Sequence, residues 1–207
     1  VVRRAGDLGR PDAVILPGSK NTLADLAALA ESGLARAVAG LEGCEVVGVC
    51  AGLQMLGACL EDPLGLESGL GSREGLGLLP LATRLEREKT LLLSRATHLP
   101  SGLALSGYEI HHGVTSATGP GAQVLAVGEG GRPLAWGRPG EAWGTYLHGV
   151  FDEHGFRRWW LNALRAKKGL APLPARQGPG LDEALDRLAG IVRQSLDMKA
   201  VYALMGL

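Results

Sequence analysis

The sequence predicts an α/β protein with a mostly parallel central sheet, helices on both faces of that sheet, and additional antiparallel strands. Three observations carry this prediction. Short apolar runs alternate with helical periods in the first part of the chain, which is typical of a doubly wound sheet. Short β-like runs separated by glycine follow in the second part. The chain has 207 residues, of which 46% are hydrophobic, and a chain of this length buries roughly 70% of its unfolded surface.

The first strand and helix follow the amino-terminal segment. Residues 12–16 form an apolar run between two prolines, as expected for a buried parallel strand. A helix should follow, because Asn21 or Thr22 can cap it and leucines recur at helical spacing up to the break at Gly40.

The remaining elements are predicted from alternation and helical spacing. A strand over residues 45–49 leads through Cys50 into an apolar helix over residues 52–60. Further strands are expected near residues 76–79, 90–97, 107–111, 123–127, 133–137 and 143–146. Further helices are expected over residues 155–168, 182–196 and 199–204.

Composition divides the chain into three parts. A Pro/Gly-rich stretch over residues 171–181 is predicted to link a domain of residues 1–170 to a helical extension of residues 182–207. The chain begins with Val1 rather than methionine, so we expect it to be cut from a longer polypeptide.

Charge and composition exclude several classes of protein. The 21 Lys and Arg residues balance the 21 Asp and Glu residues, which argues against a nucleic-acid-binding partner. No apolar stretch approaches the roughly 20 residues of a membrane span, and no signal peptide is evident, so the expected location is the cytoplasm. The 3 cysteines match neither a disulfide framework nor a Cys-x-x-Cys metal clip.

The strongest chemical signal is Gly48-Val-Cys50-Ala-Gly52, at the predicted junction of a strand and a helix. A nucleophile on such a turn faces the crevice where α/β proteins bind ligands. A side chain at position 48 would crowd the turn, and one at position 52 would block strand-to-helix packing. The helix amino terminus is expected to lower the pKa of Cys50. Cys44 and Cys59 are interpreted as core cysteines, which is also the alternative interpretation for Cys50.

A thiolate nucleophile needs a partner that exchanges protons near neutral pH, and histidine has the suitable pKa. Among the 5 histidines, His148 stands just past a predicted strand, so it should lie at the rim of the sheet. His98 and His154 fall in polar contexts and are predicted to be solvated.

A second polar cluster lies on the predicted strand over residues 107–111. Glu109 and His111 should share one face of this strand, and His112 should lie on the other. The adjacent histidines have no Cys-x-x-Cys or His-x-x-x-His companion, so we expect no metal site.

These motifs resemble those of a known superfamily. Residues 48–54 resemble the nucleophile elbow of class I glutamine amidotransferases, which take ammonia from glutamine through a Cys/His pair. Four more segments occur in matching order and resemble the cobyric acid synthase family in particular: residues 16–22, 75–79, 107–111 and 144–152. The resemblance runs from about Pro11 to Gly169 and implies a flavodoxin-like amidotransferase fold.

The resemblance implies a role for individual residues. Cys50 would attack the carboxamide of glutamine and form a thioester. His148 would protonate the departing ammonia and then activate the water that hydrolyses the thioester. Backbone N–H groups of Ala51 and of the Gly18 turn would face the developing oxyanion. Gln54, one helical turn past the nucleophile, would help to hold the substrate.

The third catalytic residue is left open. Many class I amidotransferases carry a glutamate two residues after the histidine, but Val150 stands there in this chain. Either the Cys/His pair works alone or another acid orients the ring, with Glu109 and Asp152 as candidates and His111 in a supporting role.

The resemblance also implies a partner in the same polypeptide. In the family, ammonia passes to an amino-terminal synthetase domain that uses ATP and Mg²⁺ to amidate four carboxylates of a corrinoid, adenosylcobyrinic acid a,c-diamide. This chain has no Gly-x-x-x-x-Gly-Lys-Ser/Thr loop, so we expect no cofactor in this domain. A class I domain would also have a strand and helix ahead of Asp12, which residues 1–10 cannot supply.

Two alternatives remain. The chain could be the glutaminase subunit of another ATP-dependent ligase, such as one that amidates cell-wall precursors, although residues 17–22 argue against this. It could also be a partner-binding domain without catalytic activity.

Overall fold

The computed structural model describes residues 1–174 and 181–207. The chain divides into two compact units, residues 1–173 and residues 174–207, and each is described by itself. The strands of the first unit are β1 (Ala13–Leu16), β2 (Glu45–Val49), β3 (Cys59–Glu61), β4 (Ser72–Glu74), β5 (Leu81–His98), β6 (Ala104–Ala117), β7 (Gln123–Gly128), β8 (Pro133–Arg138) and β9 (Ala142–Thr145). Its helices are α1 (Thr22–Glu31), α2 (Leu34–Ala39), α3 (Ala51–Leu56) and α4 (His154–Lys167), with short 3₁₀ turns η1 (Ala5–Asp7) and η2 (Glu129–Gly131).

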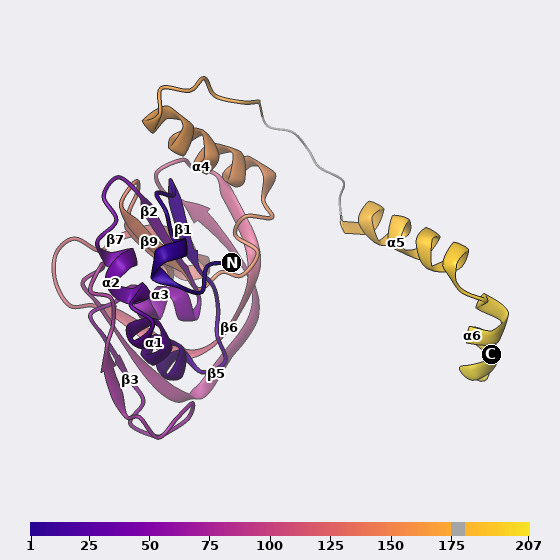
Figure 1. Ribbon diagram of the computed structural model, residues 1–207, viewed down its shortest axis with the longest axis horizontal. Coiled ribbons are helices and arrows are strands. Elements are labelled where there is room, and N and C mark those ends of the chain that lie inside the picture. Colours follow the sequence, from indigo (N-terminus) through magenta and orange to yellow (C-terminus); the bar gives the residue numbers. More distant parts are fainter. Residues whose placement is uncertain (175–180) are drawn as a thin grey trace. The chain divides into compact units, whose positions relative to one another are not determined.

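The strands form one mixed sheet in the order β1-β2-β9-β8-β7-β5-β3-β4, and β6 pairs with β5 (Figure 1). Parallel pairing joins β1 to β2, β2 to β9 and β3 to β5, whereas the other pairs are antiparallel. The α/β class predicted from the sequence is therefore confirmed, but the sheet is less parallel than expected. Short turns connect β5 to β6, β7 to β8 and β8 to β9, and short turns permit only antiparallel neighbours.

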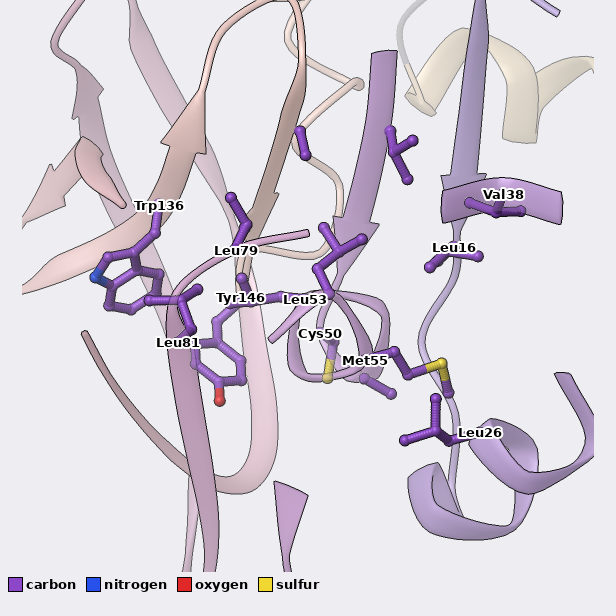
Figure 2. Packing of buried hydrophobic residues seen from close by; sticks show 14 residues of the cluster. Leu16, Leu26, Val38, Cys50, Leu53, Met55, Leu79, Leu81, Trp136 and Tyr146 are labelled. Carbon is purple, nitrogen blue, oxygen red and sulfur yellow. The ribbon is translucent and has the colours of Figure 1, made fainter. Parts of the chain in front are cut away.

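Helices cover both faces of the sheet. Val46 and Val47 are neighbours on β2, so their side chains point to opposite faces. Val46 belongs to a core cluster with residues of α1, α2 and α3, part of which is shown in Figure 2. Val47 belongs to a second cluster that contains Phe156 and Trp160 of α4. In Figure 1, α1, α2 and α3 accordingly lie together and α4 lies apart from them.

Several predicted boundaries differ from the observed ones. The helix expected over residues 52–60 ends at Leu56, because the backbone becomes extended at Gly57, with a ψ of 175°. An added Cβ at Gly57 would lie 2.7 Å from the carbonyl oxygen of Leu81, where the chain passes close by. Residues 76–79 do not form a strand. Their N–H groups instead bind the end of α3, with Leu76 donating to the carbonyl of Met55 at 2.8 Å. Gly33, with a φ of 76°, separates α1 from α2, where one longer helix was expected.

The second unit contains α5 (Leu181–Ser195) and α6 (Met198–Leu204), close to the helices predicted there. The side chain of Asp197 caps α6 by accepting hydrogen bonds from the N–H groups of Lys199 and Ala200. Most of the linker predicted over residues 171–181 lies outside the described residues. In the described part of the chain, no helix is long and apolar enough to cross a membrane.

Candidate active site

Cys50 lies on a sharp turn between β2 and α3. Its φ is 54° and its ψ is −109°, and no other non-glycine residue in the described ranges has a positive φ. The flanking glycines are required for packing, as the sequence predicted. An added Cβ at Gly48 would lie 2.4 Å from the carbonyl carbon of Gly52, and one at Gly52 would lie 2.0 Å from the carbonyl oxygen of Leu16. A positive φ at a non-glycine residue, as at Cys50, is a strained backbone conformation and is typical of residues held in place for a function.

The thiol of Cys50 is buried and protonated in the free site. Its Sγ lies 3.5 Å from the carbonyl oxygen of Ile110 on β6, to which it donates a hydrogen bond. Burial raises the pKa of Cys50 to about 11; the N–H of Ala51 lowers it, and the charges of Glu67 and Glu109 raise it further. The N–H at the start of α3 therefore lowers this pKa, as expected, but desolvation outweighs it and the net shift is upward.

His148 follows β9 and is fixed by strand-like pairing with β6. Its backbone N–H donates to the carbonyl of Tyr108 at 2.8 Å, and its ring stacks on the Tyr108 ring with centroids 4.8 Å apart. Burial lowers the pKa of His148, and the nearby His111 lowers it further. Within the described residues, its Nε2 is buried and has no hydrogen-bond partner. This nitrogen is therefore available to exchange a proton with a substrate or a nucleophile.

Gly18 lies beside both Cys50 and His148. An added Cβ at this position would be 3.1 Å from Cε1 of His148 and 3.7 Å from Cβ of Cys50. The two side chains therefore face the same narrow space, and glycine at position 18 keeps that space open. Three residues that are far apart in the sequence meet here because β1, β2 and β9 are adjacent parallel strands whose carboxyl ends share one edge.

A cavity of about 650 Å³ opens over this space. It brings together Cys50, His148 and the predicted Gly18, Ala51 and Gln54. The other residues that line it are Ser19, Lys20, Thr22, Leu66, Glu67, Lys89, Ile110, His111 and His112.

Gln54 is buried at the base of this cavity and is already held by the protein. Its Oε1 accepts a hydrogen bond from the Thr22 hydroxyl at 3.2 Å, and its Nε2 donates to the Tyr146 hydroxyl at 3.4 Å. Burial raises the pKa of Tyr146 to about 12, although its bonds with Thr115 and Gln54 oppose the shift, so the hydroxyl remains neutral. The amide of Gln54 is thus kept in one orientation.

Neither acid offered by the sequence touches the His148 ring in the described structure. Glu109 is fully buried, and Arg132 binds it with two hydrogen bonds of 2.9 and 2.5 Å. Burial alone raises the pKa of Glu109, but hydrogen bonds from Arg132, His111 and Ser94 outweigh it and hold the pKa at about 2. Asp152 is exposed beside Gly149. Alternation along β6 turns the side chain of Tyr108, and not that of Glu109, toward His148.

Glu109 instead positions His111. The Nε2 of His111 lies 3.3 Å from Oε2 of Glu109, and its Nδ1 lies 2.9 Å from the carbonyl oxygen of Gly113. The ring also stacks on Tyr146, with centroids 3.7 Å apart. Glu109 therefore helps to hold the ring of His111, which lines the cavity.

One of the two histidines outside the cavity differs from expectation. His98 was predicted to be solvated, but it is a buried residue of β5 packed against Phe156 and Trp159. Burial lowers its pKa to about 4, so it is neutral. His154 begins α4 and contacts Arg157.

Glu67 and Lys89 line the cavity but were missed by the sequence reasoning. Glu67 lies in the irregular loop between β3 and β4, where no periodicity marks a position as inward. The available signal was local: Asp62 precedes a proline and can accept hydrogen bonds from the N–H groups that follow it. The structure shows this arrangement, with Asp62 accepting from Leu66, Glu67 and Ser68 at 2.7, 2.9 and 3.2 Å.

Comparison with known proteins gives a consistent result. Residues 1–156 match the family model described as "CobB/CobQ-like glutamine amidotransferase domain". The chain is 44% identical over 248 residues to a cobyric acid synthase of Nitratidesulfovibrio vulgaris, covering 100% of this chain and 45% of that protein. It is 43% identical to an adenosylcobalamin biosynthesis bifunctional protein, CobDQ, of Leptospira interrogans, covering 100% of this chain and 24% of that protein. This chain therefore spans less than half the length of these relatives.

Solved structures share the fold. A crystal structure of a glutamine amidotransferase superposes with a TM-score of 0.59 at 20% identity, covering 82% of this chain and 85% of that chain. The structure of PurLQS from Thermotoga maritima gives a TM-score of 0.52 at 16% identity, covering 76% of this chain and 82% of that chain.

Proposed function

Because the chain belongs to the CobB/CobQ-like glutamine amidotransferase domain family, we propose that residues 1–170 are a glutaminase domain that uses Cys50 and His148. The observation that carries this proposal is their placement across Gly18 in one cavity, with Cys50 on a strained turn and Nε2 of His148 free of protein partners among the described residues. A nucleophile and a base need this proximity.

The first half of the reaction forms a thioester. His148 takes the thiol proton as Sγ of Cys50 attacks the carboxamide carbon of glutamine, because burial keeps the thiol protonated until a base is engaged. The N–H groups of Ala51 and of the Gly18 turn stabilise the oxyanion. The tetrahedral intermediate then collapses, the C–N bond breaks, and the proton held by His148 passes to the nitrogen, which leaves as ammonia.

The second half releases glutamate. His148, neutral again, takes a proton from a water molecule that attacks the thioester carbon. The C–S bond breaks, the proton returns to the sulfur, and glutamate leaves. The lowered pKa of His148, caused first by burial, keeps the ring neutral and able to act as this base near pH 7.

The ammonia serves an ATP-dependent synthetase in the same polypeptide. The relative named cobyric acid synthase supports this proposal. This chain covers 45% of that protein and 24% of the CobDQ relative, which leaves room in both for further domains. We assign ATP and Mg²⁺ to that synthetase, whose substrate is the corrinoid adenosylcobyrinic acid a,c-diamide, amidated on four carboxylates during cobalamin biosynthesis.

Cysteine labelling tests the nucleophile. Iodoacetamide or a diazoketone analogue of glutamine should alkylate Cys50, as located by peptide mass spectrometry. Cys50→Ala should lower glutamate release by at least about a thousandfold, and in the complete synthetase it should abolish glutamine-dependent amidation but leave ammonia-dependent amidation intact.

Cys44→Ala is the matched control, because Cys44 is also a buried free thiol. It should retain both labelling and activity. Alkylation of Cys44 in place of Cys50 would refute the assignment.

A further inference from the structure

Glu67 has the placement expected of a residue that recognises substrate charge. It is the only acidic residue among the described residues that line the cavity of Cys50 and His148, and two lysines, Lys20 and Lys89, line the same cavity. Free glutamine carries an α-ammonium group and an α-carboxylate near pH 7. A site that binds the free amino acid therefore needs an anionic partner for one of these groups and a cationic or N–H partner for the other.

The loop that carries Glu67 is held in place by Asp62. The carboxylate of Asp62 accepts N–H groups from three residues of the loop, including that of Glu67 itself at 2.9 Å. Burial raises the pKa of Asp62, but these hydrogen bonds outweigh it and hold the pKa below its usual value. Asp62 is therefore ionised near pH 7, and the backbone of Glu67 is fixed before any substrate arrives.

The Glu67 carboxylate is oriented but not saturated. Its Oε2 accepts the backbone N–H of Thr22 at 2.5 Å, and its Oε1 lies 3.3 Å from the Thr22 hydroxyl. An ionised carboxylate offers about four acceptor positions, so the N–H of Thr22 and, at most, its single hydroxyl proton leave capacity for a further donor. The same Thr22 hydroxyl lies 3.2 Å from Oε1 of Gln54, which connects Glu67 to the buried amide at the base of the cavity.

We propose that Glu67 is the specificity-determining residue that binds the α-ammonium group of glutamine. This inference rests on the proposed glutaminase function, which places the carboxamide of the substrate at Cys50. Glu67 then discriminates glutamine from carboxamides of the same shape that lack the amino group.

A structural role alone is the competing explanation. Thr22 begins α1, and a carboxylate at a helix amino terminus is stabilising in itself. The capping role is already filled by Asn21, whose side chain accepts the N–H of Ala24 at 3.0 Å. The two explanations differ in one respect, because only recognition of the ammonium group makes the effect of Glu67 depend on the substrate.

The test compares glutamine with glutaramate, which is glutamine without its α-amino group. Each compound is used to protect Cys50 of the full chain from iodoacetamide, and each variant is normalised to its own unprotected rate. The wild-type chain should be half-protected at a glutamine concentration at least about tenfold below the glutaramate concentration, as for a charge-assisted hydrogen bond. Glu67→Gln should lose this preference through weaker protection by glutamine, with glutaramate unchanged.

Two further variants and the wild type complete the test. Glu74→Gln removes an equal charge from an exposed residue of β4 and should retain the wild-type preference. Glu67→Asp keeps the charge and should retain part of the preference for glutamine over glutaramate. This variant also keeps the test valid if Glu67→Gln misfolds. An unchanged preference in Glu67→Gln would overturn the inference while leaving the glutaminase function intact. Failure of both compounds to protect wild-type Cys50 would overturn the glutaminase function and the inference together.

Discussion

Replacing Gly18 by alanine would place a single methyl group beside both the nucleophile and its base. The new Cβ would lie 3.1 Å from Cε1 of His148 and 3.7 Å from Cβ of Cys50. Ordinary contact begins at 3.4 Å, so the imidazole ring must retreat by a few tenths of an ångström. The methyl group would also narrow the path by which a carboxamide approaches the sulfur.

The expected losses of stability and of activity are very different. The ring borders an open cavity and can yield, so the free energy of unfolding should fall by about 1 kcal/mol or less. A misplacement of about 1 Å costs about a hundredfold in rate, so the smaller shift together with the obstructed path should reduce glutamate release by about tenfold to a hundredfold.

The assay measures glutamate release and the thermal melting temperature of each variant. Gly119→Ala is the control for an added methyl group, because its nearest neighbour would be Cβ of Pro80 at 4.0 Å. Gly52→Ala is the opposite control, since its Cβ would meet a backbone oxygen at 2.0 Å and should prevent stable folding. If Gly18→Ala releases glutamate at the wild-type rate, Cys50 and His148 do not react across this space.

Two pH-dependent predictions follow from the buried ionisable groups. The rate of alkylation of Cys50 by iodoacetamide should still rise above pH 9, because burial raises the pKa of this thiol to about 11; a plateau reached below pH 8 would instead indicate a preformed thiolate–imidazolium pair. Glu109 has a pKa of about 2 against an ordinary 4.5, so its stabilising contribution is complete above pH 4.5 and is lost as the pH falls toward 2. Glu109→Gln should therefore lower the free energy of unfolding by about 2–3 kcal/mol at pH 7 and by less at pH 3, measured by urea titration. An equal loss at both pH values would contradict this linkage.

The sequence was most informative where one residue type meets a local requirement. The glycines around Cys50 predicted a strand-to-helix turn. In the structure, backbone atoms lie so close to these glycines that a side chain would not fit. The position of His148 after a strand likewise predicted that it would lie at the rim of the sheet. Periodicity located β1, β2, β7, β8, β9 and α4 to within about two residues.

Long-range contacts set the features that the sequence did not predict. The close approach of Leu81 to Gly57, just past the end of α3 at Leu56, involves a segment that is distant in the sequence. The partnership of Glu109 with Arg132 joins β6 to the start of β8, and the pairing cannot be inferred until the sheet is assembled. The raised pKa of Cys50 reflects burial by distant segments. This effect outweighs the lowering of the pKa by the N–H of Ala51 at the start of α3, which is the local effect that the sequence predicts.

One strand, β6, supports both reacting groups. The carbonyl of Ile110 accepts a hydrogen bond from the thiol of Cys50. The ring of Tyr108, two residues earlier, stacks on the imidazole of His148. The relative position of nucleophile and base therefore depends on one short stretch of extended backbone. An error in the register of the β5–β6 hairpin would therefore displace both groups together.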